Sequence, residues 1–189
     1  MRLFVAVELD KAVRNAAEEI ARQLRVRVDP ELRARWVPAL NMHLTVRFIG
    51  HVADERVPDV LTALQPPMPI APFDLRLAEC GVFPPHGAPR VLWIGIGEGL
   101  PSLQALHDEC NRRLAPLGFE PEHRPLNAHL TLARAKDASR GSGAIVREAI
   151  RALRVPRQHC RVLEAVVFES RLSPNGSTYH ARLRVPLAL

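Results

Sequence analysis

The chain has 189 residues, of which 47% are hydrophobic and 24% are charged, with a formal net charge of +6. This composition is typical of a folded protein and excludes global disorder, and the length fits one globular unit or two small lobes that share a core. No apolar run approaches the roughly 18 residues that a membrane-spanning helix needs, so we expect no membrane partner.

The hydrophobic pattern of the first half predicts strands and helices in alternation. Period-two alternation predicts strands over residues 3–9, 43–50 and 73–81. Helical spacing predicts helices over residues 11–27 and 54–64, and Asp10 stands in the position of an N-cap. Residues 29–38 are predicted to form a loop, and the proline cluster 66–69 breaks the chain before the third strand.

The second half repeats this order. Strands are predicted over residues 90–97, from His129 onward, and over 158–169 and 179–186. Helices are predicted over residues 101–117, closed by Gly118, and over 143–153, and residues 172–177 form a hairpin-type turn. The repeated order indicates a gene duplication, so we predict that residues 1–189 form a single domain of two pseudo-symmetric lobes.

One tetrapeptide pattern occurs in both halves. His43-Leu44-Thr45-Val46 in the first half returns as His129-Leu130-Thr131-Leu132 in the second. Because residues i and i+2 of a strand share a face, each tetrad presents a His and a Thr together and turns its apolar residues into the core. Two such strands around one cleft supply two imidazoles, whose unperturbed pKa of about 6.5 suits a general base and a general acid.

Motifs for metal or nucleophilic catalysis are missing from the sequence. It contains no His-x-His, Cys-x-x-Cys or His-Glu-x-x-His, so we predict no metal ligands, and only a metal site assembled from distant residues stays open. It has no Gly-x-Ser-x-Gly, and none of its three cysteines stands in a catalytic motif.

The cysteines and the N-terminus both indicate a compartment. Cys80, Cys110 and Cys160 are scattered and odd in number, which favours reduced thiols over a disulfide framework. The stretch through Glu8 is too short and too soon acidic for a signal peptide. We therefore expect a cytoplasmic protein.

Two histidines with two threonines suit the cleavage of a phosphodiester. One imidazole takes a proton from water and the other protonates the departing alkoxide, while hydroxyls and an arginine hold the non-bridging oxygens. Arg134 continues the second tetrad as His-x-Thr-x-x-Arg. Its odd offset from His129 means that a bend or a strand end must turn it into the cleft, whereas strict alternation places Arg47 on the face of His43.

These residues resemble the 2H phosphoesterase superfamily, which is defined by two His-x-Thr/Ser-hydrophobic motifs. Four segments are similar to its RNA 2′,3′-cyclic phosphodiesterase branch, the bacterial and archaeal 2′-5′ RNA ligase-like proteins: residues 1–8, 41–50, 89–95 and 170–174. The resemblance spans essentially the whole chain. It implies an α+β fold that is bilobal, pseudo-symmetric and duplicated, with two antiparallel sheets lining a central cleft and helices outside.

The resemblance also implies a reaction. The branch hydrolyses a 2′,3′-cyclic phosphate at an RNA end to a 2′-phosphomonoester without a metal or nucleotide cofactor, and in reverse the chemistry forms a 2′-5′ linkage. By the family pattern, His43 is the proton donor to the leaving 3′ oxygen and His129 is the acceptor that activates water. Thr45, Thr131 and Arg134 bind the phosphate. The symmetry of the two tetrads does not by itself decide which histidine is the acid.

We therefore predict a metal-independent, cofactor-free hydrolase that acts as a monomer on RNA with 2′,3′-cyclic phosphate ends, tRNA fragments among them. Two alternatives stay open. One is a 2H phosphoesterase that acts on another small cyclic phosphate or an RNA 3′ tail. The other is a non-catalytic module that binds RNA ends.

Two further features bear on an RNA substrate. Of the 26 basic residues only Lys11 and Lys136 are lysines, and arginine suits phosphate recognition, although a GC-rich genome produces the same excess. Phe48 and Phe83 are candidates for stacking on an unpaired base, with core packing the more common use of such residues.

Overall fold

The structure is a computed structural model that describes residues 1–29, 31–122, 126–138, 141–173 and 176–188. The strands are Arg2–Glu8 (β1), Leu32–Trp36 (β2), His43–His51 (β3), Phe73–Phe83 (β4), Val91–Glu98 (β5), His129–Ala138 (β6), His159–Val162 (β7), Glu164–Ser173 (β8) and Gly176–Pro186 (β9). The α-helices are Lys11–Val28 (α1), Val57–Leu64 (α2), Leu100–Leu114 (α3) and Ser142–Arg151 (α4). Three short 3₁₀ turns are Ala39–Asn41, Asp54–Arg56 and Ala115–Leu117.

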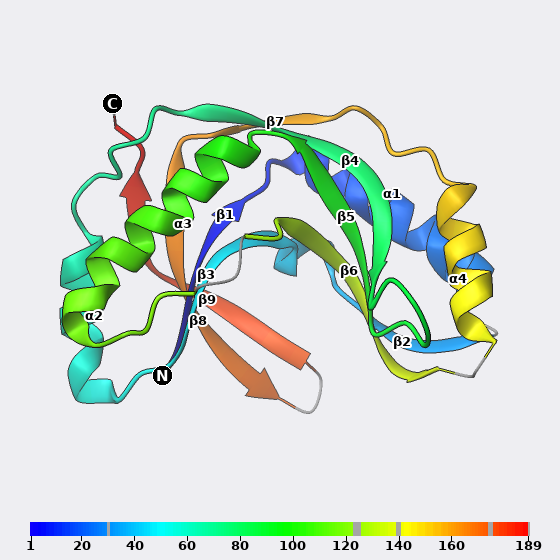
Figure 1. Cartoon of the computed structure of the whole chain (residues 1–189), viewed down its shortest axis with the longest axis horizontal. Helices are drawn as coiled ribbons and strands as arrows, with labels where there is room; N and C mark the ends of the chain where they lie inside the picture. Colours follow the sequence, from blue (N-terminus) through cyan, green and yellow to red (C-terminus); the bar gives the residue numbers. More distant parts are fainter. Residues whose placement is uncertain (30, 123–125, 139–140, 174–175, 189) are drawn as a thin grey trace.

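Within these residues the strands form one curled sheet in the order β7-β4-β5-β6-β3-β1-β8-β9, with β2 paired to β6. The four α-helices lie on its outer side, as Figure 1 shows. The order is symmetric about the contact between β6 and β3, so the two expected antiparallel sheets are halves of a single sheet. Their junction is one antiparallel residue pair, Leu44 with Leu130. The α+β class, the antiparallel pairing and the outer helices are confirmed.

The helices are exchanged between the halves. Helix α1 follows β1 along the chain but packs against α4 and β6, and α3 follows β5 but packs against β3 and α2. Each half of the sheet is therefore covered by one helix from each half of the sequence (Figure 1). This exchange ties the halves together and leaves the inner face of the sheet free of helices.

The core lies between the sheet and the helices. Leu44, Val46, Leu130 and Leu132 are each no more than 1% exposed, as the alternation of the two tetrads predicts. Burying an aliphatic side chain of this size stabilises the fold by about 1.5–3 kcal/mol. Since these residues alternate with the histidines and threonines, the same burial turns the polar side chains toward the inner face.

Most predicted elements are present, with shifted ends. The Asp10 N-cap is confirmed, because its Oδ1 accepts a hydrogen bond of 2.8 Å from the Val13 amide. The predicted loop 29–38 was wrong in part, since it contains β2, whose ladder bonds come from β6, far along the chain. The predicted strand 158–169 is divided at Leu163 into β7 and β8.

Most of the predicted turn 172–177 belongs to strands. Strand β8 continues to Ser173 and β9 begins at Gly176, and residues 174–175 lie outside the described residues. The three cysteines, Cys80, Cys110 and Cys160, are free thiols in the structure. None of the described helices combines the length and the apolar character that crossing a membrane requires.

Candidate active site

The junction of the two halves brings the two His-x-Thr tetrads together. In an antiparallel pair centred on Leu44 and Leu130, the His of each tetrad lies beside the Thr of the other. A cavity of about 270 Å³ opens there on the inner face. Its lining is Val37, Asn41, His43, Thr45, Phe48, His129, Thr131, Arg134 and Tyr179. All five residues singled out in the sequence therefore line one cavity.

Arg134 faces this cavity because β6 carries a β-bulge. Thr131 pairs with Trp93 and Ala133 pairs with Leu92, which leaves Leu132 as an extra residue. An extra residue shifts the alternation by one and re-aims the side chains that follow. This bulge therefore provides the bend that turns Arg134 into the cavity despite its odd offset from His129.

Strand β3 carries the matching bulge, which overturns the expectation for Arg47. Thr45 pairs with Ala6 and Arg47 pairs with Val5, so Val46 is the extra residue. Arg47 is consequently turned away from the cavity, where it is 5% exposed, and Phe48 takes the cavity position instead. Strict alternation was wrong here because it cannot anticipate a residue inserted into the ladder.

Each histidine is oriented by a backbone carbonyl two residues before it. The Nδ1 of His43 lies 2.8 Å from the Asn41 carbonyl oxygen, and the Nδ1 of His129 lies 2.7 Å from that of Asn127. A carbonyl only accepts, so Nδ1 carries the donated proton and Nε2 is left for chemistry on both rings.

Sequence reasoning missed these two asparagines, although the signal is in the chain as a longer repeat, Asn-x-His-Leu-Thr. Asn41 has a further contact that Asn127 does not share in the described residues. Its Nδ2 donates a 3.0 Å hydrogen bond to the Ser177 carbonyl in β9. The segment before His43 is thereby tied to the β8–β9 hairpin.

The ring of His43 lies against an apolar cluster on the inner face. Its centroid is 4.9 Å from those of Phe4 and Tyr179, and Phe4 stacks on Phe168. Burial lowers the pKa of His43, and the positive charge of Arg134 lowers it further. The hydrogen bond to the Asn41 carbonyl and the charge of Glu8 act in the opposite direction, but burial is the largest effect.

The ring of His129 has different aromatic neighbours. Its centroid is 5.1 Å from that of Phe83, which stacks on Trp93 at 5.0 Å. The Trp93 ring lies over Gly81, where a β-carbon would come within 2.2 Å of the indole, so glycine is needed there. Phe83 therefore packs within an aromatic pair beside the cavity that the two tetrads line.

A second cavity of about 290 Å³ adjoins the first on the side of His43. The two share Thr45, Phe48, Arg134 and Tyr179 besides His43. Phe48 is 39% exposed, and the guanidinium of Arg2 lies 4.9 Å above its ring. The combined space thus has a polar centre with an aromatic and cationic end.

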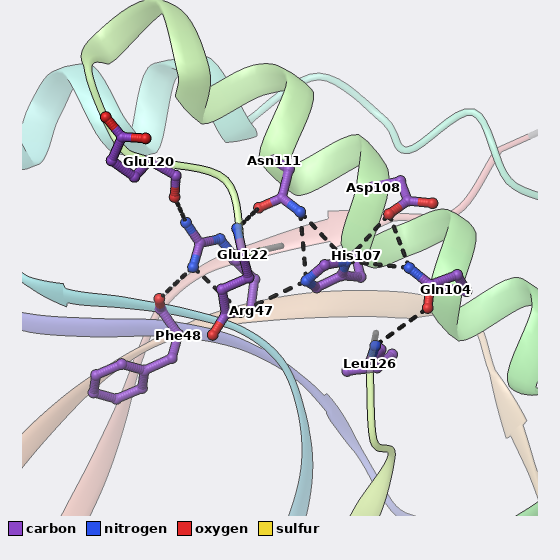
Figure 2. A network of polar contacts seen from close by, with 9 residues as sticks. All are labelled: Arg47, Phe48, Gln104, His107, Asp108, Asn111, Glu120, Glu122 and Leu126. Atoms are coloured by element: carbon purple, nitrogen blue, oxygen red, sulfur yellow. Dashed lines mark hydrogen bonds and ion pairs between the residues drawn. The ribbon is translucent and has the colours of Figure 1, made fainter. Parts of the chain in front are cut away.

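Behind the sheet, Arg47 links β3 to the segment that precedes His129. Figure 2 shows its guanidinium donating hydrogen bonds to the carbonyls of Phe48 and Glu120 and pairing with Glu122, at 3.2 Å from the carboxylate. Glu122 also lies 3.6 Å from Nε2 of His107 on α3. Because β3 and β6 share one residue pair, this link is a second restraint between the two tetrads.

The same segment is also held by α3. The Asn111 side chain accepts a hydrogen bond from the Glu122 amide at 3.4 Å, and the Gln104 side chain accepts one from the Leu126 amide at 3.3 Å (Figure 2). Glu122 and Leu126 are therefore both anchored to α3.

The thiols are poor candidates for a nucleophile. Burial raises the pKa of Cys80 to about 12, and burial raises that of Cys110 to about 12 as well. Burial likewise raises the pKa of Cys160. Near neutral pH all three thiols are protonated, and the thiolate is the reactive form.

Comparison with known proteins points to one family. The family model described as LigT-like phosphoesterase matches the chain over residues 7–93 and again over residues 94–179, and each match contains one His-x-Thr tetrad. A protein of Aquifex aeolicus named RNA 2′,3′-cyclic phosphodiesterase is 32% identical over 142 residues, which cover 74% of this chain and 73% of that protein.

Solved structures agree with this assignment. TT0787 of Thermus thermophilus has a TM-score of 0.74 at 29% identity and covers 99% of this chain and 98% of its own. E. coli LigT complexed with 3′-AMP has a TM-score of 0.72 at 26% identity, with 100% of this chain and 98% of that chain covered.

Proposed function

The chain belongs to the LigT-like phosphoesterase family, and on that premise we propose that it hydrolyses 2′,3′-cyclic phosphate ends of RNA to 2′-phosphomonoesters by two-histidine acid–base catalysis. The observation that carries the proposal is the single cavity lined by both histidines, both threonines and Arg134. The name of the Aquifex relative, RNA 2′,3′-cyclic phosphodiesterase, supports this choice of substrate. The solved neighbour with 3′-AMP bound supports a cleft that accepts a nucleotide phosphate.

In the proposed reaction the two imidazoles act on opposite sides of the phosphorus. Nε2 of His129 takes a proton from water, and the water oxygen forms a bond to phosphorus. The bond from phosphorus to the 3′ oxygen breaks, and that oxygen receives the proton held on Nε2 of His43. The product keeps its phosphate on the 2′ oxygen, and a later proton exchange with solvent resets both rings.

The remaining cavity residues would hold the phosphate. The hydroxyls of Thr45 and Thr131 donate to its non-bridging oxygens, and Arg134 pairs with the charge that develops on them. This arrangement also explains how His43 becomes an acid despite its lowered pKa. An anionic phosphate offsets the charge of Arg134 and raises the pKa of His43, so the substrate itself promotes protonation of the ring.

The adjoining cavity would receive the terminal nucleoside. Its exposed Phe48 offers a stacking surface, and such surfaces bind bases with little sequence preference. A 5′-hydroxyl in place of water would yield a 2′-5′ linkage by the same displacement. All proposed site residues come from one chain, so we expect a monomer to be active.

Product analysis tests the proposal. Purified protein is incubated with an RNA oligonucleotide that ends in a 2′,3′-cyclic phosphate, with and without a metal chelator, and the 2′- and 3′-phosphate products are separated. We expect the 2′-phosphate as the product, at a rate that the chelator does not change. Binding without turnover would show a non-catalytic RNA-end module. A 3′-phosphate product would show that the 2′ oxygen, and not the 3′ oxygen, is the leaving group.

A further inference from the structure

A row of basic side chains continues from the catalytic cavity along β6 and β2. Arg134 and Lys136 lie in β6, Arg33 and Arg35 lie in β2, and all four are exposed. Arg35 is the direct cross-strand partner of Arg134. We call these four side chains the cation row.

The cation row lies on the inner face of the sheet. Residues of β2 and β6 that alternate with it, Ala34, Ala135 and Ala138, pack against the core on the outer side. A second bulge in β6 pairs Arg33 with Asp137 and leaves Lys136 as the extra residue. Since Arg134 lines the catalytic cavity, the row leads from that cavity toward the far ends of both strands.

Among the described residues, three members of the cation row have no carboxylate partner, whereas several other arginines of the protein do. Arg161 pairs with Asp74 at 2.9 Å, and Arg22 pairs with Glu19 at 2.6 Å. In the part of the chain that the structure describes, no carboxylate forms an ion pair with Arg33, Arg134 or Lys136, and the neighbouring Asp137 forms none.

The register of β2 and β6 places Arg35 directly opposite Arg134, so two positive side chains lie side by side next to the cavity. Guanidinium groups form strong, geometrically specific hydrogen bonds with phosphate oxygens. The aromatic pair Phe83 and Trp93 lies on the same face across β6, since Trp93 is the cross-strand partner of Thr131. Both rings are partly exposed, and cations next to aromatic rings are typical of sites that bind single-stranded nucleic acid.

We propose that the cation row binds the phosphodiesters on the 5′ side of the cyclic end of a single-stranded RNA. The row thereby makes an oligonucleotide a better substrate than a mononucleotide. Arg33 and Arg35 are two residues apart, about 7 Å along a strand, which is comparable to the spacing of successive phosphates in an extended chain. This inference rests on the proposed function, because the cyclic phosphate must occupy the cavity for the chain to reach the row.

The test compares two substrates, adenosine 2′,3′-cyclic monophosphate and a pentaadenylate that ends in a 2′,3′-cyclic phosphate. We expect kcat/KM of the natural protein to be at least about tenfold higher for the pentamer, the effect of about 1.4 kcal/mol of added binding. In the double variant Arg33→Gln/Lys136→Gln this ratio falls toward one. For the pentamer, kcat/KM decreases with salt concentration, and the slope of log kcat/KM against log salt becomes less negative by about 0.7 for each cation removed.

A matched variant controls for the loss of charge. Lys11→Gln/Arg154→Gln removes the same net charge from exposed positions at the start of α1 and after α4, and it keeps the ratio of the natural protein. Equal kcat/KM for the two substrates in the natural protein overturns the cation row while the proposed function stands. A ratio that survives in Arg33→Gln/Lys136→Gln overturns it as well. Absence of hydrolysis of both substrates overturns the proposed function itself.

Discussion

Strands β3 and β6 carry the same His-x-Thr pair and the same bulge, yet they differ at the two positions that follow. Behind the sheet, β3 has the charged Arg47 where β6 has the small Ala133. Toward the cavity, β3 has Phe48 where β6 has Arg134. The shared part of the two strands therefore supplies a His and a Thr side chain from each half, and the positions after the bulge give each half a different side chain at the cavity.

The surroundings of the two histidines follow this division. His43 lies in an apolar cluster next to the cavity that ends at Phe48, which suits a nucleoside. His129 lies on the strand that continues into the cation row, which suits phosphates. On the proposed function, the β3 half would therefore face the sugar and base, and the β6 half would face the phosphates of the RNA chain.

The largest expected effect is the loss of either imidazole. We expect His43→Ala and His129→Ala each to lower kcat for cyclic-phosphate hydrolysis by about 10²–10⁴-fold, the usual contribution of one general acid or base. The measurement is single-turnover hydrolysis, with circular dichroism to show that both variants stay folded. A folded variant that keeps near-full activity would contradict the two-histidine mechanism.

The next largest effects distinguish the role of Arg134, which we expect in kcat, from that of Phe48, which we expect in KM. Arg134→Met removes the cation that faces the developing charge, and we expect kcat to fall by about 10²–10³-fold, as for other groups that stabilise such charge. Phe48→Leu removes a stacking surface worth about 1–3 kcal/mol per base, so we expect mainly a higher KM for nucleotide substrates. Steady-state kinetics of the two variants side by side tests this contrast. A fall of kcat alone in Phe48→Leu, with KM unchanged, would remove the assignment of its cavity to the nucleoside.

The cavity was predictable where it depends on local periodicity, and not where it depends on the ladder between distant strands. The alternation in both tetrads was enough to predict which residues of His43-Leu44-Thr45-Val46 are buried. The bulges at Val46 and Leu132 were not predictable, because an inserted residue is defined only against the partner strand. They decide the orientation of Arg47 and Arg134.

The same limit applies to the fold. The repeated order of elements predicts the duplication, but the apolar face of a helix does not indicate which half of the sheet that helix covers. The exchange of α1 and α3 between the halves is therefore visible only in the tertiary contacts. Strand β2 was missed for a related reason, since its pairing with β6 cannot be inferred from the short segment itself.

A smaller effect is expected at the back of β3. Arg47→Met leaves the Glu120 carbonyl and the Glu122 carboxylate without their guanidinium, which we expect to cost about 1–3 kcal/mol of unfolding free energy. We also expect kcat to fall by about ten- to a hundredfold with little change in KM, because the His129 strand loses its second restraint to β3. Urea unfolding and steady-state kinetics measure the two quantities.

Arg113 provides the matched control for Arg47. Its side chain is only 8% exposed, and it also holds a loop, because it donates to the carbonyls of Pro66 and Pro67 and pairs with Glu109. That loop does not lead to either tetrad. We expect Arg113→Met to lose comparable stability and to keep kcat. Arg47→Lys should recover part of the lost activity. Equal effects of the two Met variants on kcat would reduce Arg47 to a structural residue.

The smallest effect concerns the protonation of His43. Burial and Arg134 keep its pKa below the ordinary value of about 6.5, so Arg134→Met should raise that pKa, and bound inorganic phosphate should raise it in the natural protein. NMR titration of the two imidazoles measures both shifts, with His129→Ala used to assign the signals.

The sign of the His43 shift also determines a dependence of stability on pH. In the unfolded chain the imidazole takes up its proton at a higher pH than in the folded protein, so His43 makes stability fall as pH drops below about 6.5. Arg134→Met should weaken this dependence, because it brings the two pKa values closer together. A pKa of His43 that falls in Arg134→Met would show that the arginine does not act on the ring through its charge. Protonation of His43 by the substrate would then lose its physical basis.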